Sequence, residues 1–398
     1  MDAPKFDPTA PLPAPPDPWA GSDMPSARSG PPYHMTDMIA AEPHLAGRLL
    51  GRLLSRGSPA GELAGAVRDA ASVGHPIVVT GCGTSEHGAQ GVADILREAL
   101  RAGGVSVEPN AVMSAQAFEA ALDPQRSGLL IGVSHEGGSA ATNAVMQAAR
   151  SAGARVALIT AGPASPGAAL AGIVVTTDEM DQSWCHTIGY LAPLLAAAAT
   201  GSIISGRRLE PGTISQLMAM GSRDEAGAEA SAGILAGASH IIVIASGADR
   251  PAARELVLKI EEAAWLPSAM RDLETFLHGH LPATGESTGL VLILADRDHR
   301  AERLARARQA LAAARVVGIK VAAILAADAA TALDQGLTPA GRLIVPETPS
   351  LPAPVAALLG TATPLQLLTE RIARAAGTNP DAIRRDDPRY LEAAAAGE

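Results

Sequence analysis

The stretch that decides the fold is Ile77-Val-Val-Thr-Gly-Cys-Gly-Thr-Ser-Glu-His87, which is followed by the helix-like segment Gly88–Leu100. An apolar, β-branched run that ends in glycines and hydroxylated residues just before a helix predicts a strand, a tight turn and a helix. Such a turn leaves backbone N–H groups at the helix N-terminus, where they can bind an anion. Thr84 and Ser85 could equally serve as helix caps. From this stretch alone, the anion site and the plain capped turn both remain open.

The same rhythm of apolar run and Ala-rich helix continues along the chain and restarts after a predicted helix at about 187–200. Alternating strands and helices predict parallel sheets with right-handed crossovers, so we expect an α/β fold of two similar halves, an internal duplication of architecture. The predicted strands are Ile77–Thr80, Val105–Glu108, Leu129–Val133, Val156–Thr160, Ile173–Thr177, Ile241–Ala245, Leu290–Ala295, Val316–Leu325 and Leu343–Val345.

Four regions are expected along the chain. Residues 1–32 are rich in proline and predict an extended arm without regular structure, which could dock on a neighbour. Residues 33–205 and 206–375 form the two α/β domains, and residues 376–398 form a C-terminal tail. The first domain should open with two amphipathic helices that are separated before Pro43, because proline disfavours helical backbone in the residue before it.

The composition limits the class of protein. The chain has 398 residues, a formal net charge of −10 and 47% hydrophobic residues, of which few are aromatic. This charge disfavours a general nucleic-acid or acidic-membrane binder. Cys82 and Cys185 are the only cysteines, which excludes a disulfide framework or a thiol zinc cluster. The longest strongly apolar run, Leu191–Ala199, is too short to span a bilayer. We therefore expect a cytoplasmic protein.

A second loop resembles the first. Ser134-His-Glu-Gly-Gly-Ser139 follows the apolar run Leu129–Val133 and precedes the helix-like segment Ala140–Arg150. Open parallel sheets bind ligands in the crevice at the carboxyl ends of their strands. Two such loops in one sheet therefore predict a shared anion-binding crevice.

These motifs resemble those of the sugar isomerase (SIS) family in its double-domain form, most closely the isomerase half of the glucosamine-6-phosphate synthases. The family's first loop reads Cys-Gly-Thr-Ser, as Cys82–Ser85 does, and its second typically reads Ser-Gln-Ser-Gly-Glu-Thr. The entry pattern Met-x-x-x-Ile-x-x-x-Pro matches Met35 to Pro43. The family's Glu-x-x-x-Lys-x-x-Glu matches Glu255–Glu262, and its His-Gly matches His278-Gly279. The resemblance covers roughly residues 33–392 and implies two SIS-type three-layer α/β/α domains, each with a parallel, flavodoxin-like sheet.

The resemblance assigns the catalytic residues. The cluster Glu255, Lys259 and Glu262 has the spacing of one helix face and by itself fits either a solvated, salt-bridged stripe or a site. By resemblance, Glu262 is the base that moves a proton between C1 and C2, and Lys259 supports it. His278 matches the ring-opening histidine, which in the family reaches across from the neighbouring subunit, so a homodimer is implied, although the nearby His280 could take its role.

The resemblance also assigns the binding residues and implies a small sugar or sugar phosphate as ligand, with no cofactor, metal or nucleic acid. Small hydroxyls at helix starts suit a dianion. The residues matched to substrate binding are Thr84, Ser85, Ser134, His135, Glu136, Ser139 and, more loosely, Gln182.

Two departures from the family pattern affect the expected reaction. Glu136 replaces a phosphate-binding serine and would repel a phosphate, unless it turns away or recognises sugar hydroxyls or an amine. His135 beside it could be a compensating cation or a cap. Ala393 stands at the family's tail lysine, which weakens an amination route. We expect an aldose–ketose isomerase acting on a sugar phosphate. The alternatives are an amino sugar-phosphate deaminase, a non-catalytic sugar-phosphate-binding regulator, and an isomerase for a non-phosphorylated or sulfonated sugar.

Overall fold

The computed structural model describes residues 6–21, 28–106, 108 and 110–396. The chain forms two compact units, each assembled from several segments. Unit 1 comprises Met1–Asp23, Pro43–Asp181 and Ile188–Ser215, and unit 2 comprises Met24–Glu42, Gln182–Thr187 and Gln216–Glu398. Helices α1 (His34–Leu53) and α7 (Pro211–Gly221) contain residues of both units.

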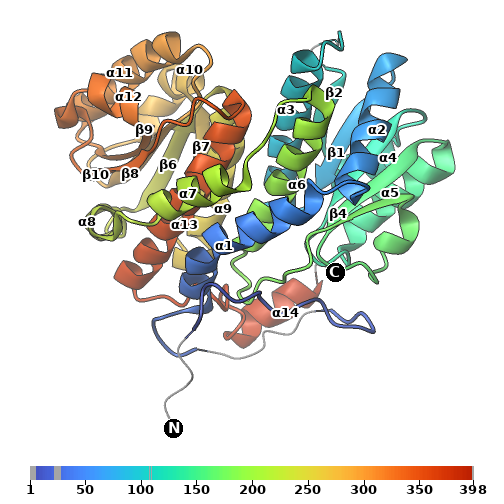
Figure 1. The fold of residues 1–398 in the computed structure, drawn as a ribbon. Helices are drawn as coiled ribbons and strands as arrows, with labels where there is room; N and C mark the ends of the chain where they lie inside the picture. Colours follow the sequence, from blue (N-terminus) through green and yellow to red (C-terminus); the bar gives the residue numbers. More distant parts are fainter. Residues whose placement is uncertain (1–5, 22–27, 107, 109, 397–398) are drawn as a thin grey trace. The chain divides into compact units, whose positions relative to one another are not determined.

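Unit 1 is built on a five-stranded parallel sheet with the strand order β2-β1-β3-β4-β5 (Figure 1). Ile77 of β1 pairs with Val112 of β2 on one side and Leu129 of β3 on the other, so the first strand lies inside the sheet. The elements of this unit are α2 (Pro59–Ser72), β1 (Ile77–Gly81), α3 (Thr84–Ala102), β2 (Val112–Gln116), α4 (Ala117–Leu122), β3 (Leu129–Val133), α5 (Ala140–Ala152), β4 (Arg155–Thr160), β5 (Ile173–Thr176) and α6 (Ile188–Ser205).

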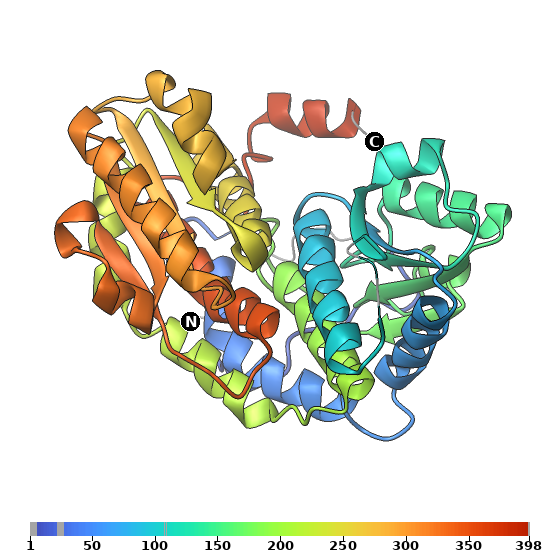
Figure 2. The same cartoon turned by 90° about the horizontal axis from the view of Figure 1, so that it is seen from above.

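Unit 2 repeats this plan with the order β10-β9-β8-β6-β7, again all parallel. In both units the first strand has the second on one side and the third, fourth and fifth on the other. Helices flank each sheet (Figure 2), which confirms the predicted α/β class and the duplicated architecture. The elements are α8 (Glu225–Leu235), β6 (His240–Ala245), α9 (Arg250–Ala264), β7 (Ser268–Asp272), α10 (Leu273–Thr275), β8 (Thr288–Leu294), α11 (Arg300–Val317), β9 (Lys320–Ala326), α12 (Ala327–Ala332), β10 (Gly341–Val345), α13 (Ala353–Ala376) and α14 (Pro388–Ala396).

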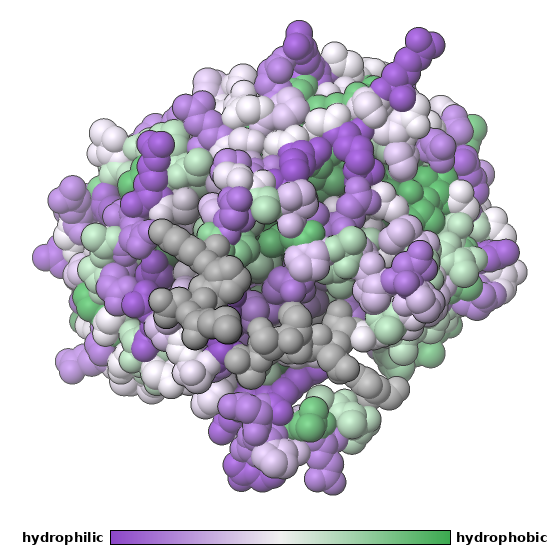
Figure 3. Space-filling view, turned by 60° about the horizontal axis from the view of Figure 1, so that its bottom comes forward, coloured by the Kyte–Doolittle hydropathy of each residue, from purple (hydrophilic) through white to green (hydrophobic). Residues whose placement is uncertain are grey.

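The apolar residues form the cores of these layers. All seven residues of β8 are buried, because helices cover both faces of its sheet. Helix α6 is long and apolar enough to cross a membrane, yet 83% of it is buried within the structure. Its composition is therefore that of a core helix, packed against α3 and α2. On the face shown in Figure 3, hydrophilic residues surround smaller hydrophobic patches.

Three local predictions were wrong. Pro43 lies inside one continuous helix, α1, because buried side chains on both sides of it, including Met35, Ile39 and Leu45, hold the helix together. One of the boundaries between segments of the two units falls at this proline. A strand was predicted at Val105–Glu108. Residue 107 lies outside the described residues, and residues 105, 106 and 108 are not in a strand. The strand that pairs with β1 on that side is β2, and the half-polar edge strand β7 was not predicted.

Candidate functional site

The first predicted loop joins β1 to α3. Gly81 allows the strand to end against the turn, since a Cβ there would stand 2.6 Å from the Ser85 backbone oxygen and 2.8 Å from that of Val133. Gly83 is the N-cap of α3 and has φ +56°, a left-handed conformation that favours glycine. Thr84 and Ser85 are buried in the first turn of the helix. Neither residue occupies the N-cap position, which Gly83 takes.

The second loop follows β3 and is held by its neighbours. The Ser134 N–H donates to the backbone oxygen of Ile159 on β4, and its Oγ accepts from the Gly137 N–H at 3.2 Å. Ser139 is the N-cap of α5, and its side chain makes no capping hydrogen bond. The loop is thus folded back on the carboxyl end of β4.

A chain of side chains connects the two loops. Cys82 Sγ lies 3.4 Å from Thr142 Oγ1, and the Thr142 hydroxyl donates to Ser139 Oγ at 3.3 Å. Strands β1 and β3 are adjacent, so the loops meet at the point where the strand order reverses, which is where open α/β sheets bind ligands. The structure therefore brings Thr84, Ser85, Ser134 and Ser139 to one edge. Thr142 was missed in the sequence, although it lies one helical turn beyond Ser139.

His135 is a residue of the second loop, and its side chain is buried. Its Nε2 accepts a hydrogen bond from the Asp181 backbone N–H at 2.9 Å, which requires that nitrogen to be unprotonated. Burial lowers the pKa of His135 to about 4. The ring is therefore neutral at pH 7, which fits the cap considered above and not the compensating cation. Glu136 is half-buried in the same loop, whereas Gln182 belongs to unit 2.

The predicted catalytic cluster lies on α9 in unit 2. The side chains of Glu255 and Lys259 are 0% exposed, and that of Glu262 is 23% exposed. Lys259 Nζ is 2.5 Å from Glu262 Oε2 and 3.7 Å from Glu255 Oε1. The alternative of a solvated salt-bridged stripe is thus wrong, because two carboxylates share one buried ammonium.

This arrangement sets the protonation of the cluster. Burial opposes the charge of Lys259, but the attraction of Glu262, Cys185 and Glu255 outweighs it and raises the lysine pKa. For Glu262, burial outweighs the ion pair with Lys259, and the like charge of Glu255 adds to it, so the pKa of its carboxyl is raised. A carboxylate of raised pKa, held by a cation and partly open to solvent, is a suitable general base.

His278 lies in the short helical segment Phe276–His280 that follows α10. Its side chain is 71% exposed, and its Nε2 is 2.7 Å from Glu274 Oε1. No hydrogen bond or ion pair within the described residues joins it to Glu262. Ala393 lies on α14, near the end of the chain. Within the part of the chain that the structure describes, no group of three or more His, Cys, Asp or Glu residues is placed to hold a metal ion.

The equivalent edge of the second sheet is filled by its own side chains. The buried Asp249 carboxylate, between β6 and α9, accepts hydrogen bonds from the backbone N–H groups of Ala295 and Asp296, at the end of β8, at 2.9 and 3.0 Å. The Asp296 carboxylate in turn accepts from the Ala248 N–H at 3.0 Å and pairs with Arg303.

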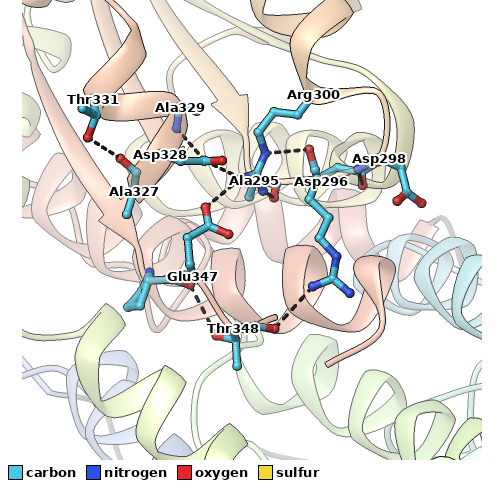
Figure 4. A network of polar contacts seen from close by, with 12 residues as sticks. Ala295, Asp296, Asp298, Arg300, Ala327, Asp328, Ala329, Thr331, Glu347 and Thr348 are labelled. Atoms are coloured by element: carbon cyan, nitrogen blue, oxygen red, sulfur yellow. Dashed lines mark hydrogen bonds and ion pairs between the residues drawn. The ribbon is translucent and has the colours of Figure 1, made fainter. Parts of the chain in front are cut away.

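The remaining strand ends of this sheet are closed in the same way. Arg300 pairs with Asp328, after β9, and lies 2.7 Å from Glu347, after β10 (Figure 4). The amides and cations that an anion would need are therefore already used by carboxylates. No local sequence pattern predicts this network, because its members are far apart in the chain. Of the two sheets, the first is the better candidate for an anion site.

Comparisons with known proteins agree with this architecture. Residues 234–339 match the SIS domain family model, and no curated protein sequence matches the chain. The C-terminal domain of glucosamine-fructose-6-phosphate aminotransferase from Francisella tularensis is similar in structure, with TM-score 0.74 and 17% identity over 89% of this chain and 99% of that one. The tagatose-6-phosphate ketose/aldose isomerase from Escherichia coli has TM-score 0.69 and 17% identity over 91% and 98%.

A third similar structure is glucosamine-6-phosphate deaminase from Thermotoga maritima, with TM-score 0.62 and 14% identity over 88% of this chain and 97% of that one. At such identities the likeness establishes the fold and leaves the reaction open. The resemblance predicted from the motifs is confirmed at this level. Residues 234–339 match the SIS domain family model, and the chain as a whole has the same two-domain α/β fold as the similar structures.

Proposed function

We propose that the protein is an SIS-type aldose–ketose isomerase acting on a sugar phosphate, with Glu262 as the base. The observation that carries this proposal is the buried ammonium of Lys259, which is shared by the buried carboxylate of Glu255 and the partly exposed carboxylate of Glu262. The carboxylate of Glu262 would take the proton from C2 of the open-chain aldose, giving an enediolate with its negative charge on O1, and return that proton to C1. The proton of the C2 hydroxyl passes to O1 through solvent, so that C1 becomes the hydroxymethyl carbon and C2 the carbonyl of the ketose. Lys259 stays protonated, orients the Glu262 carboxylate and favours negative charge in the transition state.

The binding half of the proposal rests on the first sheet. Thr84, Ser85, Ser134 and Ser139 bring small hydroxyls to one edge beside the start of α3 and α5. This chemistry suits a phosphate dianion. His135 holds the second loop in place, and Glu136 and Gln182 are proposed to contact the sugar. Support for a phosphate also comes from two of the similar structures, which are named for sugar phosphates.

Ring opening is proposed to use His278 from a second copy of the chain. Its side chain is exposed, and Glu274 pairs with its Nε2. A homodimer is thus part of the proposal, and the mass of the assembly in solution tests that part separately.

The test is hydrogen exchange at the reacting carbon. Incubation with fructose-6-phosphate in D2O should place deuterium at C2 of the aldose product, because the proton passes through a base that exchanges with solvent. With glucosamine-6-phosphate, which is an aldose, the deuterium should appear at C1 of the ketose product. Glu262→Gln should abolish the incorporation without abolishing binding. Glu261→Gln is the matched control, since Glu261 is adjacent and exposed, and it should remain active.

Each alternative gives a different result. Release of ammonia from glucosamine-6-phosphate would identify a deaminase, which the third similar structure keeps as a candidate. Binding without exchange, unchanged in Glu262→Gln, would identify a regulator. Exchange only with non-phosphorylated or sulfonated sugars would overturn the phosphate assignment.

A further inference from the structure

The proline-rich arm is fixed to the binding edge of unit 1. Leu12 is buried and its N–H donates to Glu179 Oε2 at 2.8 Å, while the Pro13 backbone oxygen accepts from the Met180 N–H at 2.9 Å. Arg48 binds both oxygens of Glu179, at 2.9 and 2.8 Å, and also donates to the backbone oxygen of Thr9. These contacts lie just after β5, so they hold the arm at the carboxyl end of the sheet.

The far end of the described arm lies on the second loop. The Trp19 Nε1–H donates to the Glu136 backbone oxygen at 3.1 Å. The indole also packs on Gly138, where a Cβ would stand 2.5 Å from Trp19 Cζ2 and 3.0 Å from Cη2. Real Cβ atoms essentially never approach another atom to less than 3.0 Å, so any side chain at position 138 would displace the indole.

The contact with Trp19 accounts for the glycine at position 138, whose backbone conformation does not itself require glycine. Its neighbour Gly137 has φ +78°, which favours glycine, but Gly138 is not among the residues with positive φ. A residue with a side chain could therefore adopt the backbone of Gly138, and among the described residues the atoms nearest to a Cβ there are those of the Trp19 indole. The chain contains only three tryptophans. Gly138 and Trp19 are thus matched to each other, as expected for an arm that stays docked.

We propose that residues 6–21 form a fixed wall of the anion-binding edge, in which Trp19 is a specificity-determining residue. The ligand class is a monosaccharide phosphate whose C–H face stacks on the indole while its anion lies at the hydroxyl loops. This inference rests on the proposed function for the identity of the ligand, whereas the docking of the arm does not. A flat aromatic side chain adds a large contact area at little cost in conformational entropy.

The experiment measures the affinity for fructose-6-phosphate and for inorganic phosphate in the full-length chain. Trp19→Ala should weaken sugar-phosphate binding about tenfold and phosphate binding much less, because only the sugar stacks. Gly138→Ala should have a similar effect although Trp19 is retained. The double variant should be no weaker than either single one. Pro16→Ala is the matched control, since Pro16 is an exposed residue of the same arm, and its affinity should equal that of the wild type.

A second readout does not need a ligand. In a Trp184→Phe/Trp265→Phe background, Trp19 is the only tryptophan, and Gly138→Ala should shift its emission to longer wavelength as the indole becomes solvated. Sugar phosphate should change this emission in the parent and leave it unchanged after Gly138→Ala. Equal affinities of the wild type and Trp19→Ala for fructose-6-phosphate would contradict the proposed role of Trp19 while leaving the proposed function intact. No binding by the wild type would overturn both the ligand assignment and the proposed function, and an unshifted emission would overturn the docking itself.

Discussion

Acidification is expected to destabilise unit 1 through His135. In the folded protein its pKa is about 4, because the ring is buried and its Nε2 accepts the Asp181 N–H. In the unfolded chain a histidine titrates near 6.5. Between these values the unfolded state binds a proton that the folded state does not, so the free energy of unfolding falls as pH falls. A difference of about 2.5 pKa units at 1.36 kcal/mol each gives roughly 3 kcal/mol in total, of which about 2 kcal/mol is lost by pH 5.

The assay compares urea unfolding of the wild type and His135→Gln at pH 7.5, 6 and 5. Glutamine is the residue of the family pattern at this position, and its side-chain oxygen can accept the Asp181 N–H without titrating. Subtracting the two pH profiles removes the contributions of the other titrating groups. The variant should lose about 2 kcal/mol less than the wild type between pH 7.5 and 5. Parallel profiles, or an NMR titration of His135 with a midpoint near 6.5, would refute the reasoning.

Two further predictions concern charge. Glu136→Ser should tighten fructose-6-phosphate binding by at least about tenfold if Glu136 faces the phosphate. The reason is that like charges about 4 Å apart repel by about 4 kcal/mol at an effective dielectric of 20. Substitution of the exposed Glu119 in Glu119→Gln is the control, and unchanged affinity in Glu136→Ser would show that Glu136 points elsewhere. Lys259→Met should cost about 3–5 kcal/mol of unfolding free energy at pH 7, because the buried Glu255 and the partly exposed Glu262 would lose their shared cation. Burial already raises the pKa of Glu262, and loss of Lys259 would raise it further in the folded state. The loss should therefore shrink as the pH falls from 7 toward 4.5, the ordinary pKa of the carboxyl, and a loss independent of pH would contradict the reasoning.

The sequence predicted those strands and helices whose positions are determined by local residue patterns. Runs such as Leu129–Val133 are apolar, short and followed by a turn, and they are strands at nearly the predicted bounds. The edge strand β2 was misplaced because Val112–Gln116 is half polar and carries little β signal. Pro43 was misjudged because packing along α1 outweighs the local preference.

The candidate site was predictable only where it follows strand ends. Thr84 and Ser134 follow buried strands, so their meeting at one edge could be inferred from a parallel sheet. The contact of Trp19 with the second loop and the hydrogen bonds of Asp249 join residues that are far apart in the chain. No periodic pattern in the sequence predicts such contacts. The burial of Lys259 depends likewise on packing that a helical spacing leaves undetermined.

The carboxylate of Asp249 gives the two halves of the chain different thermodynamics. A ligand that binds only the folded form of one unit stabilises that unit in proportion to the logarithm of its concentration. At the carboxyl edge of the second sheet, the Asp249 side chain of the protein itself accepts hydrogen bonds from the backbone N–H groups, so its local concentration is constant. We therefore expect the stability of unit 2 not to depend on the concentration of a free anion at this edge. If the first sheet binds an anion, unit 1 alone would report the supply of that anion through its stability.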